Sequence, residues 1–296
     1  MKRIVLFVTT NLAVLVVLSM VTSLLGVNRW LTSRGINYEM LLAFSAVIGF
    51  AGSFISLAIS KWIAKHAYHI QIIDQPRDQV AQWLVDKIRE QSQKAGIGMP
   101  QVGVYESEEA NAFATGPSRS NALVAVSTGL LRRMNDREVE GVLAHEVSHI
   151  ANGDMVTMTL LQGTLNTFVI FLSRVLGFAI DQLMRRGDEN RRGVGIGYYL
   201  GYIVCEIVLG ILASLIVMAY SRHREFRADA MAARLEGKDA MIGALRRLKQ
   251  ITDGGGMIDD RSPALSAFKI NSRSGLMRLF ASHPPLEERI AALERL

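Results

Sequence analysis

Long apolar runs without charged residues constrain the fold of this chain more than any other feature. The first run, Ile4–Gly26, would form a helix of about 34 Å, long enough to cross a hydrocarbon core of about 30 Å. Lys2 and Arg3 precede it, so a secretory signal peptide is an alternative interpretation. The run is too long for the apolar part of a signal peptide, and no A-x-A-like site follows it. We therefore expect an anchor that is not cleaved from the chain.

Three further apolar runs are candidates for membrane helices. Met40–Ser60 carries no charge and is soon followed by Trp62, a residue typical of the membrane interface. Met155–Ser173 and Tyr198–Tyr220 are weaker candidates. Tyr198–Tyr220 contains Glu206, and a carboxylate inside a bilayer is costly unless it is paired or protonated. We expect up to four transmembrane helices, with Glu206 facing a neighbouring helix or water.

Composition narrows the class of protein further. Half of the 296 residues are hydrophobic and 20% are charged, which excludes a disordered chain. The net charge of +6 favours contact with anionic lipid headgroups over nucleic acid, so we expect no nucleic-acid partner. The single cysteine, Cys205, excludes an internal disulfide and a cysteine-based zinc cluster. No G-x-x-x-x-G-K-[ST] motif is present, so no nucleotide partner is expected.

The remaining sequence, in 61–154 and 221–296, is polar enough to lie outside the membrane. We expect a helix, two short strands around a polar loop and a second helix over Asp78–Lys94, Gln101–Tyr105, Ala122–Ser127 and Asp136–Asn152. Asn135 or Asp136 can cap the second helix. The later part is mostly helical and is interrupted by a Gly-rich loop at Asp253–Pro263.

The candidate chemistry lies at His145-Glu146-Val147-Ser148-His149, an H-E-x-x-H pattern inside the second of these helices. A spacing of four residues places both imidazoles on one helix face, where they can bind one metal ion. Imidazole ligands in this motif fit zinc, which keeps an open position for water and lowers the pKa of that water. Glu146 then lies close enough to take a proton from the water.

A catalytic zinc needs a third protein ligand. Glu225 and Asp229 are four residues apart, so they share a helix face. One carboxylate can bind the metal and the other can accept a proton from a ligand histidine. The alternative is a solvated helix next to the membrane, in which Glu225 pairs with Arg222 or Arg224. Spacing alone leaves both interpretations open.

Several motifs in the same order resemble a known family. They are HEVSH followed by Ile-Ala-Asn-Gly-Asp154, then Ser-Arg-His-Arg-Glu-Phe-Arg-Ala-Asp229, then Ser282-His283-Pro284-Pro285 before Glu288-Arg289-Ile290. This arrangement resembles the HtpX family of bacterial heat-shock membrane proteases, gluzincin-type zinc peptidases related to the CAAX prenyl proteases. The resemblance implies one zinc ion held by His145, His149 and Glu225, with Glu146 as general base and Asp229 orienting a ligand histidine.

The resemblance also gives two further segments a role. Asn111-Ala112-Phe113-Ala114 resembles a stretch beside the catalytic cleft that offers an edge strand to substrate. The alternative is an ordinary junction between a loop and a strand. His283 resembles a histidine that stabilises the transition state. Its alternative role is structural, at the start of a helix whose first turn is favoured by proline and Glu287.

The expected fold is mainly α: a membrane-anchored α+β zincin-like metalloprotease with a small edge-strand sheet. Segment 1–60 holds two transmembrane helices, and 155–220 forms a hydrophobic helical hairpin. Segments 61–154 and 221–296 form the catalytic domain, the first with the HEVSH helix and the second with the third zinc ligand. The spacing of the motif predicts hydrolysis alone. The resemblance implies that the substrates are unfolded or misassembled membrane proteins, whose peptide bonds are cleaved in protein quality control and the stress response.

Two other functions use the same residues. A zinc-binding membrane scaffold without enzymatic activity would need the metal ligands but not Glu146. A protease that cleaves inside the membrane would need an embedded H-E-x-x-H helix, whereas Arg137, Glu138 and Glu140 crowd the start of this one.

Charge asymmetry predicts the orientation. The metal ligands precede the third apolar run and follow the fourth, so both ends of the hairpin lie on one side of the bilayer. Ten basic residues lie on that side: Lys2, Arg3, Lys61, Lys65, Arg132, Arg133, Arg137, Arg222, Arg224 and Arg227. Six lie opposite: Arg29, Arg34, Arg185, Arg186, Arg191 and Arg192. The excess places the active site in the cytoplasm. The resemblance implies that the membrane is a bacterial inner membrane. The four arginines near the hairpin tip also allow a shallow hairpin that does not cross.

Overall fold

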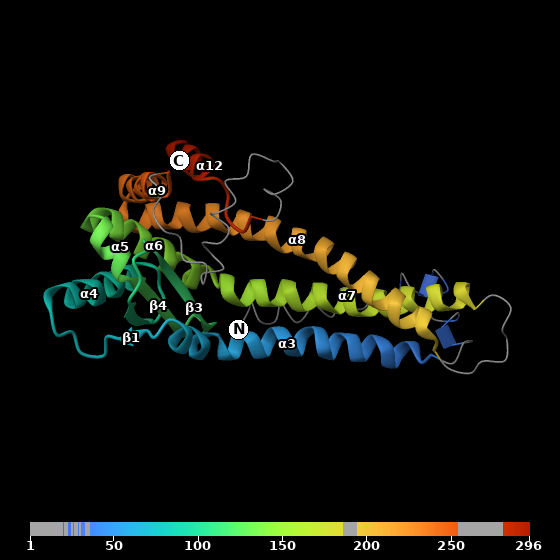
Figure 1. The fold of residues 1–296 in the computed structure, drawn as a ribbon. Coiled ribbons are helices and arrows are strands. Elements are labelled where there is room, and N and C mark those ends of the chain that lie inside the picture. The colour runs from blue at the N-terminus through green and yellow to red at the C-terminus, as the bar shows by residue number, and fades with distance from the viewer. Residues whose placement is uncertain are drawn as a thin grey trace. The chain divides into compact units, whose positions relative to one another are not determined.

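The computed structural model describes residues 36–185, 194–253 and 281–296, with a few isolated positions before residue 36. Most of the predicted anchor Ile4–Gly26, most of the Gly-rich loop Asp253–Pro263, and Arg186, Arg191 and Arg192 lie outside the described residues. The chain forms two compact units (Figure 1). Unit 1 combines residues 1–54 with 159–214, and unit 2 combines residues 55–158 with 215–296.

Three described helices are long and apolar enough to cross a membrane: α3 (Tyr38–Ala67), α7 (Asp154–Met184) and α8 (Ile196–Glu236). They contain the second, third and fourth predicted runs. α7 continues past Arg174, where the predicted run ended. The Arg174 guanidinium lies 5.3 Å from the centre of the Phe44 ring and 5.0 Å from that of Tyr202, so aromatic faces accommodate its charge.

A mixed sheet of four strands belongs to unit 2. Its order is β1 (Gln71–Ile72), β2 (Gln101–Tyr105), β4 (Asn121–Ser127) and β3 (Ala112–Ser118). β2 and β4 are parallel, and the other pairs are antiparallel. The two predicted strands are present as β2 and β4. The residue pattern predicted a polar loop between them, and only the family resemblance indicated an edge strand at Asn111–Ala114. The structure has the strand β3 there, because its backbone pairs with β4.

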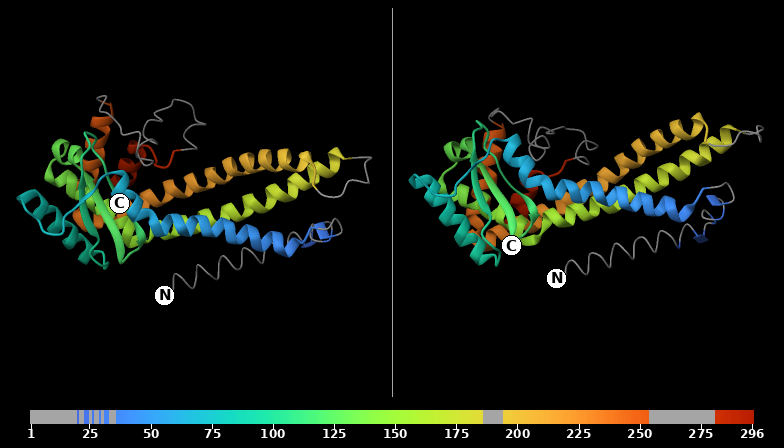
Figure 2. Two further views of the ribbon diagram at one scale, coloured as in Figure 1. Left: turned by 60° about the horizontal axis from the view of Figure 1, so that its bottom comes forward. Right: turned by 90° about the horizontal axis from the view of Figure 1, so that it is seen from below.

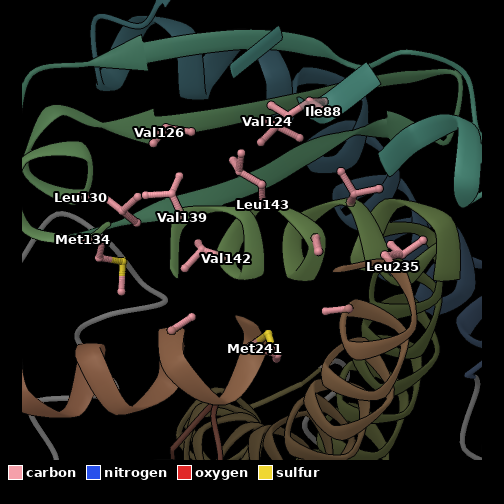
Figure 3. Packing of buried hydrophobic residues seen from close by; sticks show 14 of the residues in the cluster. Ile88, Val124, Val126, Leu130, Met134, Val139, Val142, Leu143, Leu235 and Met241 are labelled. Carbon is pink, nitrogen blue, oxygen red and sulfur yellow. The ribbon is translucent and has the colours of Figure 1, made fainter. Parts of the chain in front are cut away.

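The alternating side chains of β4 separate two hydrophobic clusters. Val124 and Val126 pack in the larger cluster, together with Leu143 of α6 (Asp136–Asn152) and residues of other helices of unit 2 (Figure 3). Leu123 and Ala125 point to the opposite face and pack in a second cluster. The large cluster joins α4 (Gln79–Lys94), α5 (Thr128–Arg133), α6, α9 (Lys238–Asp253) and α12 (Leu286–Glu294) to the sheet (Figure 2). Sheet and helices therefore fix α6 from both sides.

The ends of α6 have well-defined caps. Asn135 accepts a hydrogen bond from the Glu138 backbone, and the Glu138 carboxylate accepts one from the Asn135 backbone, which completes a capping box. At the other end Gly153 adopts the left-handed conformation (φ 69°), which a residue with a side chain adopts at a cost. This single-residue turn starts α7 at Asp154, directly beside the end of the HEVSH helix.

Candidate metal centre

Three potential metal ligands converge inside unit 2. His145 and His149 of α6 are both buried, and their Nε2 atoms lie 3.1 Å apart. Glu225, from the part of α8 beyond its apolar run, places Oε2 3.4 Å from Nε2 of His145 and Oε1 3.4 Å from Nε2 of His149. One ligand atom from each residue lies within 4.8 Å of the others. Glu225 follows His149 by 76 positions in the sequence, so only the fold brings it to the two histidines.

Each histidine turns its other ring nitrogen towards a carboxylate. Nδ1 of His145 lies 2.9 Å from Oδ1 of Asp229, and Nδ1 of His149 lies 2.7 Å from Oδ2 of Asp154. Such contacts favour the tautomer that carries the proton on Nδ1 and keeps the Nε2 lone pair for a metal. The two carboxylates therefore orient both imidazoles towards Glu225.

Arg289 of α12 holds Asp229 in place. Its Nε donates to Oδ2 of Asp229 at 2.8 Å, and its Nη2 donates to Oδ1 at 2.6 Å. Nη1 of Arg289 also lies 3.6 Å from Oε2 of Glu225. Paired bonds between a guanidinium and a carboxylate are among the strongest and most directional in proteins. The C-terminal helix is therefore part of the site's support.

These contacts outweigh burial in setting protonation. Burial alone would lower the pKa of His149, but the carboxylates of Glu225 and Asp154 raise it to about 9. Burial alone would raise the pKa of Asp229, but the Arg289 guanidinium and His145 hold it well below its usual range. Without a bound cation His149 would therefore carry a proton on both ring nitrogens at neutral pH, and a metal ion would have to displace the proton on Nε2.

Glu225 fits a metal ligand better than a structural ion pair. Its side chain is fully buried, which rules out the alternative of a solvated helix face. Oε2 lies 2.7 Å from Nδ1 of His283, whereas Oε1 is buried and forms no hydrogen bond with any residue that the structure describes. Arg224 is near, but its Nε lies 3.6 Å from Oε1. Two imidazole nitrogens and a carboxylate oxygen match the ligands that zinc prefers, and three protein ligands leave one position open.

Glu146 and His283 are the other predicted residues at this centre. Glu146 follows His145 on α6 and is partly exposed, unlike the buried carboxylates of Asp154, Glu225 and Asp229. The charge of Glu146 is one of several that raise the pKa of Arg289. His283 directly precedes the Pro284-Pro285 pair before α12 and reaches Glu225. The contacts thus bring His145, His149, Glu225, Asp229 and His283 into one cluster, and Glu146 is the neighbour of His145 in the sequence.

The predicted substrate segment lies at a sheet edge. Ala112, Phe113 and Ala114 open β3, which is the outermost strand next to β4. Asn111 precedes them, and its carbonyl oxygen accepts from the Ser127 backbone at 2.9 Å. β3 lies against α6, so this edge runs beside the HEVSH helix.

Two residues of the site were missed in the sequence. Asp154 had a local signal, because it follows His149 by five residues, directly after Gly153. Arg289 stood in one of the motifs that resemble the family but was given no role, because it is 60 positions from Asp229 and only the fold brings them together.

Comparisons with known proteins agree with this geometry. The family model of peptidase family M48 matches residues 78–296. A protease HtpX homolog of Methylacidiphilum infernorum is 61% identical, over 100% of this chain and 99% of the relative. Protease HtpX of Thioalkalivibrio sulfidiphilus is 55% identical over 99% of each chain. The crystal structure of S. mikatae Ste24p matches 95% of this chain and 66% of that one, with a TM-score of 0.63 and 20% identity, and so shows the fold alone.

These findings confirm the predicted resemblance and the mainly helical fold with a small sheet. The family match runs from α4 through the metal centre to residue 296, and the relatives align over nearly the whole chain. The chain belongs to peptidase family M48 and is a membrane metalloprotease.

Proposed function

We propose that the protein is a zinc-dependent endopeptidase that cleaves unfolded or misassembled membrane proteins in protein quality control and the stress response. The convergence of two imidazole nitrogens, from His145 and His149, on the buried carboxylate of Glu225 carries the proposal. These three residues would hold one zinc ion. Asp229 and Asp154 would keep the two imidazoles in register, as their contacts with Nδ1 indicate.

When bound, zinc would supply Lewis-acid chemistry that activates water and polarises the carbonyl of the peptide bond. Glu146 would take the proton and deliver it to the leaving amine. His283 has its Nδ1 directed to Glu225, so Nε2 is the nitrogen that would donate to the developing oxyanion. An extended substrate would add to the edge of β3, at Asn111–Ala114, through backbone hydrogen bonds.

The test is a zinc assay and a casein-type proteolysis assay in detergent, on the wild type and on Glu146→Gln. The amide keeps the shape of the side chain but cannot act as a base, so the variant should keep zinc and lose about 10²–10⁴-fold in turnover. Wild-type turnover by Glu146→Gln would contradict the mechanism and favour the scaffold without enzymatic activity.

We also propose that the protein is a multi-pass protein of a bacterial inner membrane with its active site in the cytoplasm. A cysteine at Glu189, which lies outside the described residues, tests the hairpin in a Cys205→Ser background. An impermeant thiol reagent should label it from the side opposite the catalytic unit. Labelling from the cytoplasmic side alone would show that the hairpin does not cross the bilayer.

A further inference from the structure

The end of α3 is bonded to the turn between β3 and β4. Nζ of Lys61 donates to Oδ1 of Asn121 at 2.7 Å, and Asn121 is the residue at which β4 begins. Lys61 is also the first charged residue after the apolar run Met40–Ser60. A lysine in that place keeps its ammonium group at the level of the lipid headgroups. The turn that it contacts should therefore lie at the same level.

A second contact between α3 and the sheet fixes the distance of the sheet from the bilayer surface. Ala64, one turn after Lys61, is buried in the cluster formed with Leu123 and Ala125 of β4. On the outer side of the same helix Trp62 is 62% exposed. An exposed tryptophan at the end of a membrane helix is typical of the bilayer interface. The polar contact and the apolar contact together hold β4 and its neighbour β3 at a set distance from the bilayer surface.

The edge of β3 that can pair with a peptide is short. Its register with β4 is regular from Ala112 to Thr115 and shifts between Thr115 and Ser118. Gly116 adopts a φ of 140°, and Pro117 has no backbone N–H. A bulge and a proline both interrupt the hydrogen bonding of an edge strand. An added strand can therefore pair regularly only along Ala112–Thr115. The irregular end of β3 separates this stretch from the turn at the bilayer.

We propose that β3 receives the stretch of a substrate that directly adjoins one of its transmembrane helices, and that cleavage falls within about ten residues of the bilayer. The seven residues of β3 span about 23 Å, and ten extended residues reach about 33 Å. The occupant of the edge is thus a juxtamembrane segment that leaves the bilayer beside Lys61. This inference rests on the proposed function, because it requires β3 to bind substrate.

The position of the turn can be measured without any substrate. A cysteine replaces the exposed Ser120 in the full-length Cys205→Ser chain, carries a fluorophore, and is reconstituted in vesicles of phosphatidylethanolamine and phosphatidylglycerol. Nitroxide on the lipid headgroups should quench it at least threefold more than a matched label at the exposed Gln93. Gln93 belongs to α4, which lies at the end of unit 2 away from α3 (Figure 1). Equal quenching at the two positions would overturn the proposal.

The distance rule is tested with a substrate that consists of one transmembrane helix followed by eight identical copies of a cleavable segment. Identical copies remove sequence preference, so mass spectrometry of the products reports distance alone. Wild-type protein in vesicles should cut mostly within the first two copies. The same copies without the helix, assayed in detergent, should be cut evenly.

Even cutting of the membrane-bound substrate would overturn the proposal. Glu146→Gln, run in parallel, should leave the substrate intact. If the wild type cut neither substrate, the proposed function would fail, and the quenching result would still decide where the turn lies.

Discussion

Two buried carboxylates of this protein have opposite surroundings. Asp181 of α7, in unit 1, is 1% exposed, and both of its oxygens accept backbone hydrogen bonds. Oδ2 accepts from Gly195 at 3.0 Å and Oδ1 from Tyr198 at 3.2 Å, and Nε of Arg185 lies 3.0 Å from Oδ2. Glu225 of α8, in unit 2, is fully buried, but within the described part of the chain its Oε1 accepts no hydrogen bond and faces an imidazole.

The difference separates a structural carboxylate from a ligand. Burying a charge is costly unless hydrogen bonds or an opposite charge offset the lost hydration. Asp181 obtains that compensation from the start of α8 and from an arginine of its own helix. At Glu225 the contacts within the protein offset only part of the lost hydration. The Nε2 atoms of two imidazoles face the same carboxylate. A bound cation would complete the compensation at Glu225 and has no place at Asp181.

Removing Glu225 should have the largest effect. Glu225→Ala deletes one of three protein ligands, so the variant should lose most of its zinc at micromolar free metal and most of its proteolysis. Metal analysis and the casein-type assay measure both, and Asp181→Asn serves as the control that keeps both. Full zinc occupancy in Glu225→Ala would mean that the third ligand lies elsewhere, and His283 would be examined first.

The carboxylates that orient the histidines should have intermediate effects. Asp229→Asn and Asp154→Asn should each lower zinc affinity or activity by about 10–100-fold, and added zinc should restore part of the activity. Zinc should not rescue Glu225→Ala in the same titration. Recovery of Glu225→Ala together with failure of Asp229→Asn would exchange the two roles.

Stability should distinguish Asp229 from Asp154. Asp229→Asn removes the carboxylate that the buried Arg289 guanidinium binds with two hydrogen bonds and leaves it only the more distant Glu225. Breaking a buried pair costs about 3–5 kcal/mol. Asp154 contacts the His149 imidazole, which can lose its proton, so Asp154→Asn should lower the free energy of unfolding much less. Thermal unfolding of both variants in detergent compares them. Equal losses would contradict the special role of Arg289.

Asp181→Asn should affect the fold of unit 1 alone. The amide cannot accept from both backbone donors as the carboxylate does, so we expect a loss of about 1–3 kcal/mol in unfolding free energy. Zinc content and turnover should stay within a factor of three of the wild type. A loss of zinc in this variant would break the distinction between the two carboxylates.

The smallest effect is expected at an exposed ion pair. Arg246 and Glu294 lie 2.9 Å apart with side chains 61% and 50% exposed. Exposed pairs contribute about 0.2–1 kcal/mol. Glu294→Gln should therefore change the unfolding free energy by less than about 1 kcal/mol, and a larger loss would show that α12 depends on this contact.

Local patterns in the sequence predicted those parts of the molecule that local interactions determine. The α6 helix, its Asn135 cap and the pair of histidines on one face follow from residue spacing. β3 was not predicted as a full strand, because it contains Gly116 and Pro117 and depends on pairing with β4. Arg289 depends on α12 packing near residues 60 positions earlier, and no pattern in the sequence expresses that contact. Spacing narrowed the third metal ligand to Glu225 or Asp229. In the structure the orientation of the two buried carboxylates distinguishes them, because the oxygens of Glu225 face the Nε2 atoms of both histidines.

The central claim is that His145, His149 and Glu225 hold zinc. X-ray absorption at the zinc edge of the purified full-length protein tests it most directly, with Glu225→Gln measured beside the wild type. We predict one zinc per chain with two imidazole nitrogens and carboxylate oxygen at about 2.0–2.2 Å, and loss of most of the metal in Glu225→Gln. A zinc shell with sulfur ligands, or the same shell in both proteins, would contradict the account.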